Sequence, residues 1–218
     1  MSVKTFVFRL IIVGAAISMG LLRLTAQEPS ARHYKPDLAT GRSPTAEEVA
    51  AAEKGAEANP GDFATMRKLG KTYFYRFFGA GEKDAADKAR KALTRALELQ
   101  PDDAETLAFL GSVDRLTGRE RQGIELMSKA RKLDPTNVGV LGLLSGFGDV
   151  TAMEQLRASP EFAGMSDHGR QRILLGLGKD RVRQRQPEEA RTLFTEGLAI
   201  NKGTPEARML RSEIEKLK

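Results

Sequence analysis

Cysteine is absent from the sequence, and histidine occurs only twice in 218 residues. Without cysteine the chain has no disulfide bonds, no thiolate metal site, no lipid-modified N-terminal cysteine and no cysteine nucleophile. His33 lies in a segment with Pro29 and Pro36, and His168 has no ligand-type residue three or four positions away along a helix. We therefore expect no metal site, no cofactor and no catalytic residues.

Recognisable nucleotide-binding and catalytic patterns are also missing. Gly70-Lys71-Thr72 resembles the end of a phosphate-binding loop, but residue 65 is threonine where that motif needs glycine, and no strand is predicted before it. Carboxylates are frequent, and at this density they pair by chance on solvated helices. We predict that the protein is not an enzyme.

Aromatic residues make up only 6% of the chain, and runs of β-branched residues are rare beyond the N-terminus. The chain is instead 40% hydrophobic and 29% charged, with many alanine, leucine, lysine, arginine and glutamate residues. These residue types lose little conformational freedom in a helix. The length is enough for one domain or a short repeat array, and this composition predicts an all-α fold.

The start of the chain has the pattern of an export signal. Lys4 and Arg9 precede residues 10–22, which are 13 positions without a charge. A membrane-spanning helix needs about 20 apolar residues, whereas the apolar region of a signal peptide needs about 7–15. The length favours a cleaved signal peptide, but an uncleaved anchor stays open if Arg9 extends to the lipid head groups.

This pattern sets the domain boundaries. We predict a signal peptide or membrane anchor at residues 1–26, a flexible linker at 27–43 and a helical repeat domain at 44–218. The domain would be exported: periplasmic or secreted after cleavage, and otherwise anchored to the membrane and facing away from the cytoplasm.

The net charge of +6 gives little support for nucleic-acid binding. Residues 1–26 hold three of the 35 basic residues and no acid, so the remainder carries only +3. A basic cluster near the end divides between two nearly opposite sides of a helix. One side has Arg170, Arg181 and Arg185, and the other has Arg172, Lys179 and Arg183. No aromatic residue lies between positions 163 and 193 to stack on bases, so we expect no nucleic-acid partner.

Four helix-ending phrases indicate an internal repeat: Ala58-Asn59-Pro60-Gly61, Leu99-Gln100-Pro101-Asp102, Leu133-Asp134-Pro135-Thr136 and Ile200-Asn201-Lys202-Gly203. Successive phrases are 41, 34 and 67 residues apart. Before three of them the same frame recurs, with gaps of 4, 3 and 5: Ala89, Leu93, Ala96 and Pro101; Gly123, Met127, Ala130 and Pro135; Ala190, Phe194, Gly197 and Lys202. The first two gaps keep residues on one helical face, and proline cannot continue the helix.

A Leu-Gly pair precedes each frame, at Leu69-Gly70, Leu110-Gly111 and Leu177-Gly178. This combination resembles the tetratricopeptide repeat family, which pairs a helix carrying Leu-Gly and an aromatic residue with a second, Ala-rich helix that ends before proline. Tyr73 fits the aromatic position, whereas Asp114 and Arg181 depart from it. The resemblance implies an α-solenoid of antiparallel hairpins, with three to four repeats.

Three regions modify the regular array. The first hairpin is about two turns longer than the others and should reverse at Gly79-Ala80-Gly81. Residues 138–168, with four early glycines and Pro160, form a degenerate repeat or an irregular insert of two or three helices. Thr45 opens the first helix with a capping box, and Thr204-Pro205 opens a polar C-terminal capping helix.

The resemblance also implies a concave groove lined by the first helix of each hairpin. Transferred through the Leu-Gly register, the partner-binding candidates are Arg67, Lys71, Phe74, Tyr75, Arg115, Arg172, Lys179 and Arg183. They describe a basic groove with an aromatic end, suited to an acidic or C-terminal peptide. Lys71 stands where the family's carboxylate clamps carry asparagine, so the clamp itself does not transfer.

The leading hypothesis is an exported or membrane-anchored scaffold or assembly factor that binds a protein or peptide. The alternatives are an accessory or regulatory subunit of an envelope enzyme complex, such as one for cytochrome c maturation, and a nucleic-acid-binding repeat protein. The sequence does not indicate the partner's identity or the oligomeric state.

Overall fold

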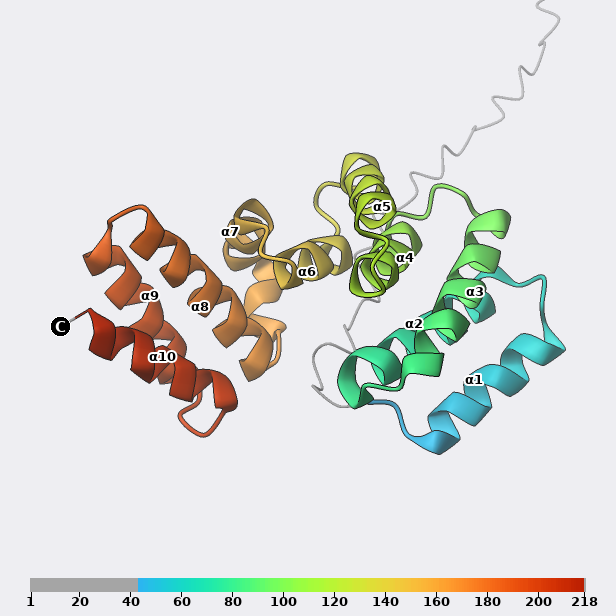
Figure 1. Cartoon of the computed structure of the whole chain (residues 1–218), viewed down its shortest axis with the longest axis horizontal. Helices are drawn as coiled ribbons and strands as arrows, with labels where there is room; N and C mark the ends of the chain where they lie inside the picture. The colour runs from blue at the N-terminus through green and yellow to red at the C-terminus, as the bar shows by residue number, and fades with distance from the viewer. Residues whose placement is uncertain (1–42, 218) are drawn as a thin grey trace, which may run out of the picture. The chain divides into compact units, whose positions relative to one another are not determined.

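The computed structural model describes residues 43–217, and this part of the chain is all-helical (Figure 1). It contains ten α-helices and one short 3-10 helix. Their bounds are α1 Ala46–Ala58, α2 Phe63–Ala80, α3 Lys83–Leu99, α4 Ala104–Leu116, α5 Glu120–Leu133, α6 Val138–Gly146, α7 Val150–Ala158, η3 Pro160–Gly164, α8 Asp167–Arg183, α9 Pro187–Ile200 and α10 Pro205–Lys216. The predicted all-α fold is confirmed.

Consecutive helices form hairpins, and each hairpin packs on the next. The pairs are α2–α3, α4–α5, α6–α7 and α8–α9, with α1 packed on α2, and α10 on both α8 and α9. One apolar cluster continues from Tyr73 of α2 to Leu193 of α9, which makes the hairpins share a core. The predicted α-solenoid of antiparallel hairpins is therefore present, and the described residues form four hairpins where three to four repeats were predicted.

Small residues allow the two helices of a hairpin to approach closely. A Cβ atom added to Gly123 of α5 would lie 2.5 Å from the carbonyl oxygen of Gly111 in α4, and one added to Gly111 would lie 2.8 Å from the carbonyl oxygen of Gly123. In α2 and α8 the Leu-Gly glycines, Gly70 and Gly178, instead make room for the buried side chains of Leu93 and Phe194. The glycines that repeat in the sequence are thus the positions where the two helices of each hairpin meet.

Helix starts are marked by side chains that accept a hydrogen bond from the backbone amide of the first turn. The residues that do this are Thr45, Asp62, Asp103, Asn137, Asp149, Ser166 and Thr204. Thr45 and Glu48 form the predicted capping box. These bonds satisfy amides that have no partner within the helix, and they fix where these seven helices begin.

The first hairpin is the long one that the spacing predicts. Helices α2 and α3 have 18 and 17 residues, against 13 and 14 in α4 and α5. The reversal follows Ala80 at Gly81, whose φ of 70° lies in the left-handed region that glycine adopts without strain.

Residues 138–166 form a shortened hairpin followed by the 3-10 helix. Both α6 and α7 have only nine residues, and α7 ends at Ala158 because Pro160 cannot continue it. Three glycines lie within α6, yet the helix forms because Val140, Leu141, Leu143 and Leu144 are buried in the shared core. Burial of four apolar side chains outweighs the weak helix propensity of glycine.

The predicted signal peptide or anchor at residues 1–26 lies outside the described residues, as does all of the predicted linker except Ser43. Within residues 43–217, no helix combines the length and the apolar character needed to span a bilayer.

We expect Gly123→Ala to lower the free energy of unfolding by about 1–3 kcal/mol, because the new methyl group would overlap the backbone of α4. Gly146→Ala is the matched control, since a Cβ there has no atom within 4 Å and alanine favours a helix by about 0.5–1 kcal/mol. Urea unfolding followed by circular dichroism measures both. Equal effects of the two substitutions would contradict the close-approach argument.

Candidate partner-binding surface

The predicted cations of α2 are neutralised by acids from α4. Arg67 lies 3.3 Å from Asp103 and 3.5 Å from Glu105, and Lys71 Nζ lies 2.8 Å from Glu105 Oε1. Glu105 is only 9% exposed, so these pairs are shielded from solvent more than ordinary surface pairs. They lie beside a hollow of about 200 Å³, which is lined by Pro44, Ala64, Arg67, Lys68, Lys71, Thr72 and Tyr75.

The predicted aromatic end of the groove is part of the core. Phe74 is 3% exposed and Tyr75 is 7% exposed, and both rings pack edge-on against Phe109 of α4. The prediction that these two rings hold a partner's apolar side chain is therefore corrected, although Tyr75 contributes to the wall of the small hollow. The long first hairpin needs them to fill its contact with α4.

Arg115 of α4 connects helices and leaves little of its charge exposed. Its guanidinium lies 4.1 Å from the centre of the Phe147 ring and 2.8 Å from Glu120. The position follows the predicted register, but the side chain connects α4 to the first residue of α5 and to the residue that ends α6.

Three predicted cations of α8 are exposed on one side of that helix: Arg172, Lys179 and Arg183. Arg183 lies 2.8 Å from Asp180, and Lys179 lies 3.9 Å from Glu213 of α10. The Arg172 side chain forms no hydrogen bond or ion pair with any residue between 43 and 217. At about 100° per residue the three side chains fall within about 40° of one another. We call them the α8 basic face.

The predicted groove cations of α2 and α8 thus form two separate groups. Arg67 and Lys71 share one carboxylate, and the α8 basic face is a separate group. No hydrogen bond or ion pair between described residues joins these two groups.

A polar connection recurs three residues after the Leu-Gly glycine, where the family carries an aromatic residue. Tyr73 of α2 donates a hydrogen bond to Glu53 of α1. Asp114 of α4 pairs with Arg90 of α3. In α8 the equivalent residue, Arg181, lies 2.8 Å from Glu154 of α7. Each of these residues connects its hairpin to the helix that precedes it. The sequence marked Asp114 and Arg181 as departures from the pattern, but not what they bind.

Burial and hydrogen bonding shift the pKa values of several charged side chains. Burial lowers the pKa of Arg90, with a further contribution from Arg119. The hydrogen bond to Glu154 raises the pKa of Arg181. The carboxyls of Asp62 and Asp167 have lowered pKa values because Thr65 donates to the first, and Asn201 and Arg170 donate to the second.

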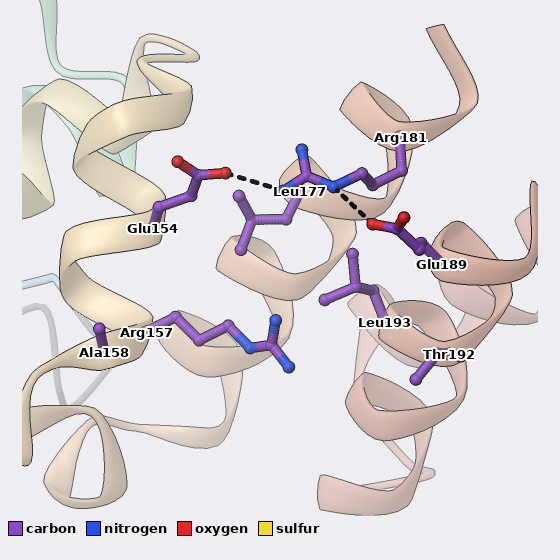
Figure 2. Close-up of a pocket in the computed structure, with 8 residues that line it drawn as sticks. All are labelled: Glu154, Arg157, Ala158, Leu177, Arg181, Glu189, Thr192 and Leu193. Carbon is purple, nitrogen blue, oxygen red and sulfur yellow. Dashed lines mark hydrogen bonds and ion pairs between the residues drawn. The ribbon is translucent and has the colours of Figure 1, made fainter. Parts of the chain in front are cut away.

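A cleft of about 500 Å³ opens beside Arg181, between α7 and the α8–α9 hairpin. Figure 2 shows that its side chains come from all three helices and face a common space. The lining residues are Glu154, Arg157, Ala158, Leu177, Arg181, Glu189, Thr192 and Leu193. No pattern in the sequence predicted this cleft, because it depends on contacts between separate hairpins.

Possible metal ligands were sought among the described residues. Among residues 43–217, no cluster of three or more histidine, aspartate or glutamate side chains is arranged to hold a metal ion.

Solved structures with a similar fold contain tetratricopeptide repeats. PilF of Pseudomonas aeruginosa has a TM-score of 0.50 and 21% identity, over 72% of this chain and 78% of that one. MamA has a TM-score of 0.48 and 21% identity, over 70% and 85%. Yeast Tom70 has a TM-score of 0.46 and 15% identity, over 81% and 44%. No family model and no curated protein matches the sequence. The fold is tetratricopeptide-like.

We expect Asp114→Asn to lower the free energy of unfolding by about 2–4 kcal/mol, because Arg90 would lose its carboxylate at a site where Asp114 is only 4% exposed. Glu125→Gln is the control, since the Arg121–Glu125 pair is 88% and 70% exposed, and its loss should change stability by less than about 0.5 kcal/mol. Chemical denaturation compares the two. A small effect at Asp114 would mean that this link between hairpins is dispensable.

Proposed function

We propose that the chain is a non-enzymatic scaffold or assembly factor that binds an acidic protein segment on the α8 basic face. A tetratricopeptide-like fold supports a role in protein interaction, because stacked hairpins present extended surfaces that need no catalytic chemistry. The observation that carries the proposal is the exposure of Arg172, Lys179 and Arg183 on one side of α8 with few compensating acids.

The chemistry of these side chains favours carboxylates in an extended segment. Each arginine presents a planar fork that can donate two hydrogen bonds to one carboxylate. The separation of seven residues between Arg172 and Lys179 corresponds to about 10 Å along the helix, so the three cations can contact acids that are spaced along a partner. A nucleic-acid partner is less favoured because no aromatic residue of α8 offers a stacking surface.

This proposal narrows the groove expected from the sequence. Arg67 and Lys71 already neutralise Glu105, and Phe74 is buried, so the α2 end offers less to an acidic partner than α8 does. The proposal includes export, which rests on the charge and length pattern of residues 1–26.

Reversal of the α8 basic face by Arg172→Glu, Lys179→Glu and Arg183→Glu together should weaken binding of a fluorescein-labelled, glutamate-rich peptide at least about tenfold at an ionic strength of about 0.1 M. The matched control reverses three exposed cations on the second helices of hairpins, through Lys91→Glu, Arg121→Glu and Lys132→Glu. Both triple variants change the net charge equally, so fluorescence anisotropy separates a local site from general attraction.

The control variant should bind within about twofold of the unmodified protein, because charges beyond a Debye length of about 10 Å are screened. Equal losses in both variants would leave only non-specific attraction. Tighter binding of a labelled single-stranded oligonucleotide than of the peptide would overturn the choice of partner.

Export is tested on the full-length chain with a C-terminal tag in a bacterial host. We expect an intact mass that lacks about the first 26 residues in a soluble exported fraction, or a full-length mass that only detergent extracts. A full-length, soluble chain in the cytosol would contradict both forms of the export proposal.

A further inference from the structure

The cleft beside Arg181 arises where the shortened hairpin meets the last one. Helix α7 has nine residues, whereas α5, the equivalent helix of the preceding hairpin, has 14. Because α7 stops at Ala158, it covers less of α8 and α9 than a full-length helix would. Leu177 and Leu193 form an apolar part of the wall of the resulting cleft, and the two residues are 2% and 5% exposed.

The first hairpin shows which group occupies the same register elsewhere in this fold. Tyr73 follows Gly70 by three residues, as Arg181 follows Gly178. The Tyr73 ring is 6% exposed, its hydroxyl donates to Glu53 of the preceding helix, and Lys88 Nζ lies 5.1 Å from its centre. A phenol ring between a carboxylate and a cation therefore fills this position at the α1–α2–α3 contact.

The last hairpin has a carboxylate on each side of this register and no aromatic ring in it. Glu154 of the preceding helix supplies a carboxylate, and Glu189 occupies the register of Lys88, since it directly precedes Ala190 as Lys88 precedes Ala89. Arg181 lies between them, at 2.8 Å from Glu154 and 3.2 Å from Glu189, and Arg157 faces the same space (Figure 2). The cleft therefore combines an apolar wall with carboxylate acceptors and two guanidinium groups.

We propose that this cleft binds a tyrosine side chain of a partner protein. The ring would lie against Leu177 and Leu193, a guanidinium group would contact the ring face, and the phenol hydroxyl would donate to Glu154 or Glu189. A volume of about 500 Å³ also admits the backbone on each side of the tyrosine.

The proposed tyrosine site is independent of the acidic-segment proposal. Arg181 is two residues from both Lys179 and Arg183, which at about 100° per residue turns it to the opposite side of α8 from the basic face. A partner segment on one site does not need to reach the other.

The test uses the full chain with ¹³C-labelled leucine methyl groups and two probes, N-acetyl-tyrosinamide and N-acetyl-phenylalaninamide. The tyrosine probe should shift the methyl signals of Leu177 and Leu193 saturably, and it should bind about fivefold to tenfold more tightly than the phenylalanine probe, because only tyrosine donates to a carboxylate. Shifts spread over other leucines, or equal affinity for the two probes, would overturn the proposal.

Two substitutions test the site by filling the cleft with an aromatic side chain of the protein itself. Arg181→Tyr restores the aromatic residue of the first hairpin, and Ala158→Trp places an indole over the cleft from an exposed position of α7. Both substitutions should abolish the leucine methyl shifts that the tyrosine probe causes. If the Arg181→Tyr protein fails to fold, the Ala158→Trp protein alone provides the test. Lys179→Glu, on the basic face, is the control and should leave probe binding unchanged while it weakens binding of the acidic peptide. Retained probe binding in a folded Ala158→Trp protein would contradict the site.

Discussion

The close approach of two helix backbones within a hairpin is the constraint on which the rest of the structure depends. Gly111 and Gly123 leave no room for a Cβ between α4 and α5, and Gly178 leaves room only for the ring of Phe194. Because each hairpin requires a small residue at a fixed position of its first helix, only one helix of the pair can place a large side chain at that contact, and other large side chains are left to pack against neighbouring hairpins. The spacing of the repeat therefore determines which residues connect one hairpin to the next.

The residue three positions after the Leu-Gly glycine is one of these connections, and its chemistry changes along the chain. It is a phenol in α2, a carboxylate in α4 and a guanidinium in α8, and each bonds to the helix that precedes its hairpin. Tyr73 brings apolar volume together with its hydroxyl, whereas Arg181 brings charge with a thinner side chain. This difference, together with the short α7, explains why a cleft accompanies Arg181.

The sequence predicted the helices well because their signals are local. The Leu-Gly pairs, the frames before Pro101 and Pro135, and the capping residue Thr45 each act within a few residues, and the corresponding helices begin and end accordingly. The candidate site depended on contacts across hairpins. A register places Arg67 and Phe74 on the first helix of a hairpin, but it does not show that Glu105 neutralises one or that Phe109 covers the other.

The distribution of acids explains why two hairpins with similar sequences differ as binding surfaces. Asp103, the N-cap of α4, and Glu105 in its first turn pair with the cations of α2, so those charges stabilise a contact within the chain. Helix α10 offers the α8 basic face only Glu213, which lies 3.9 Å from Lys179 and 3.0 Å from Lys216. Two carboxylates thus serve the two cations of α2, whereas Glu213 alone serves both Lys179 and Lys216, and the Arg172 side chain has no acid partner among the described residues. The charge that remains on α8 is therefore available to a partner, which is why the same register yields a structural contact at α2 and a candidate binding surface at α8.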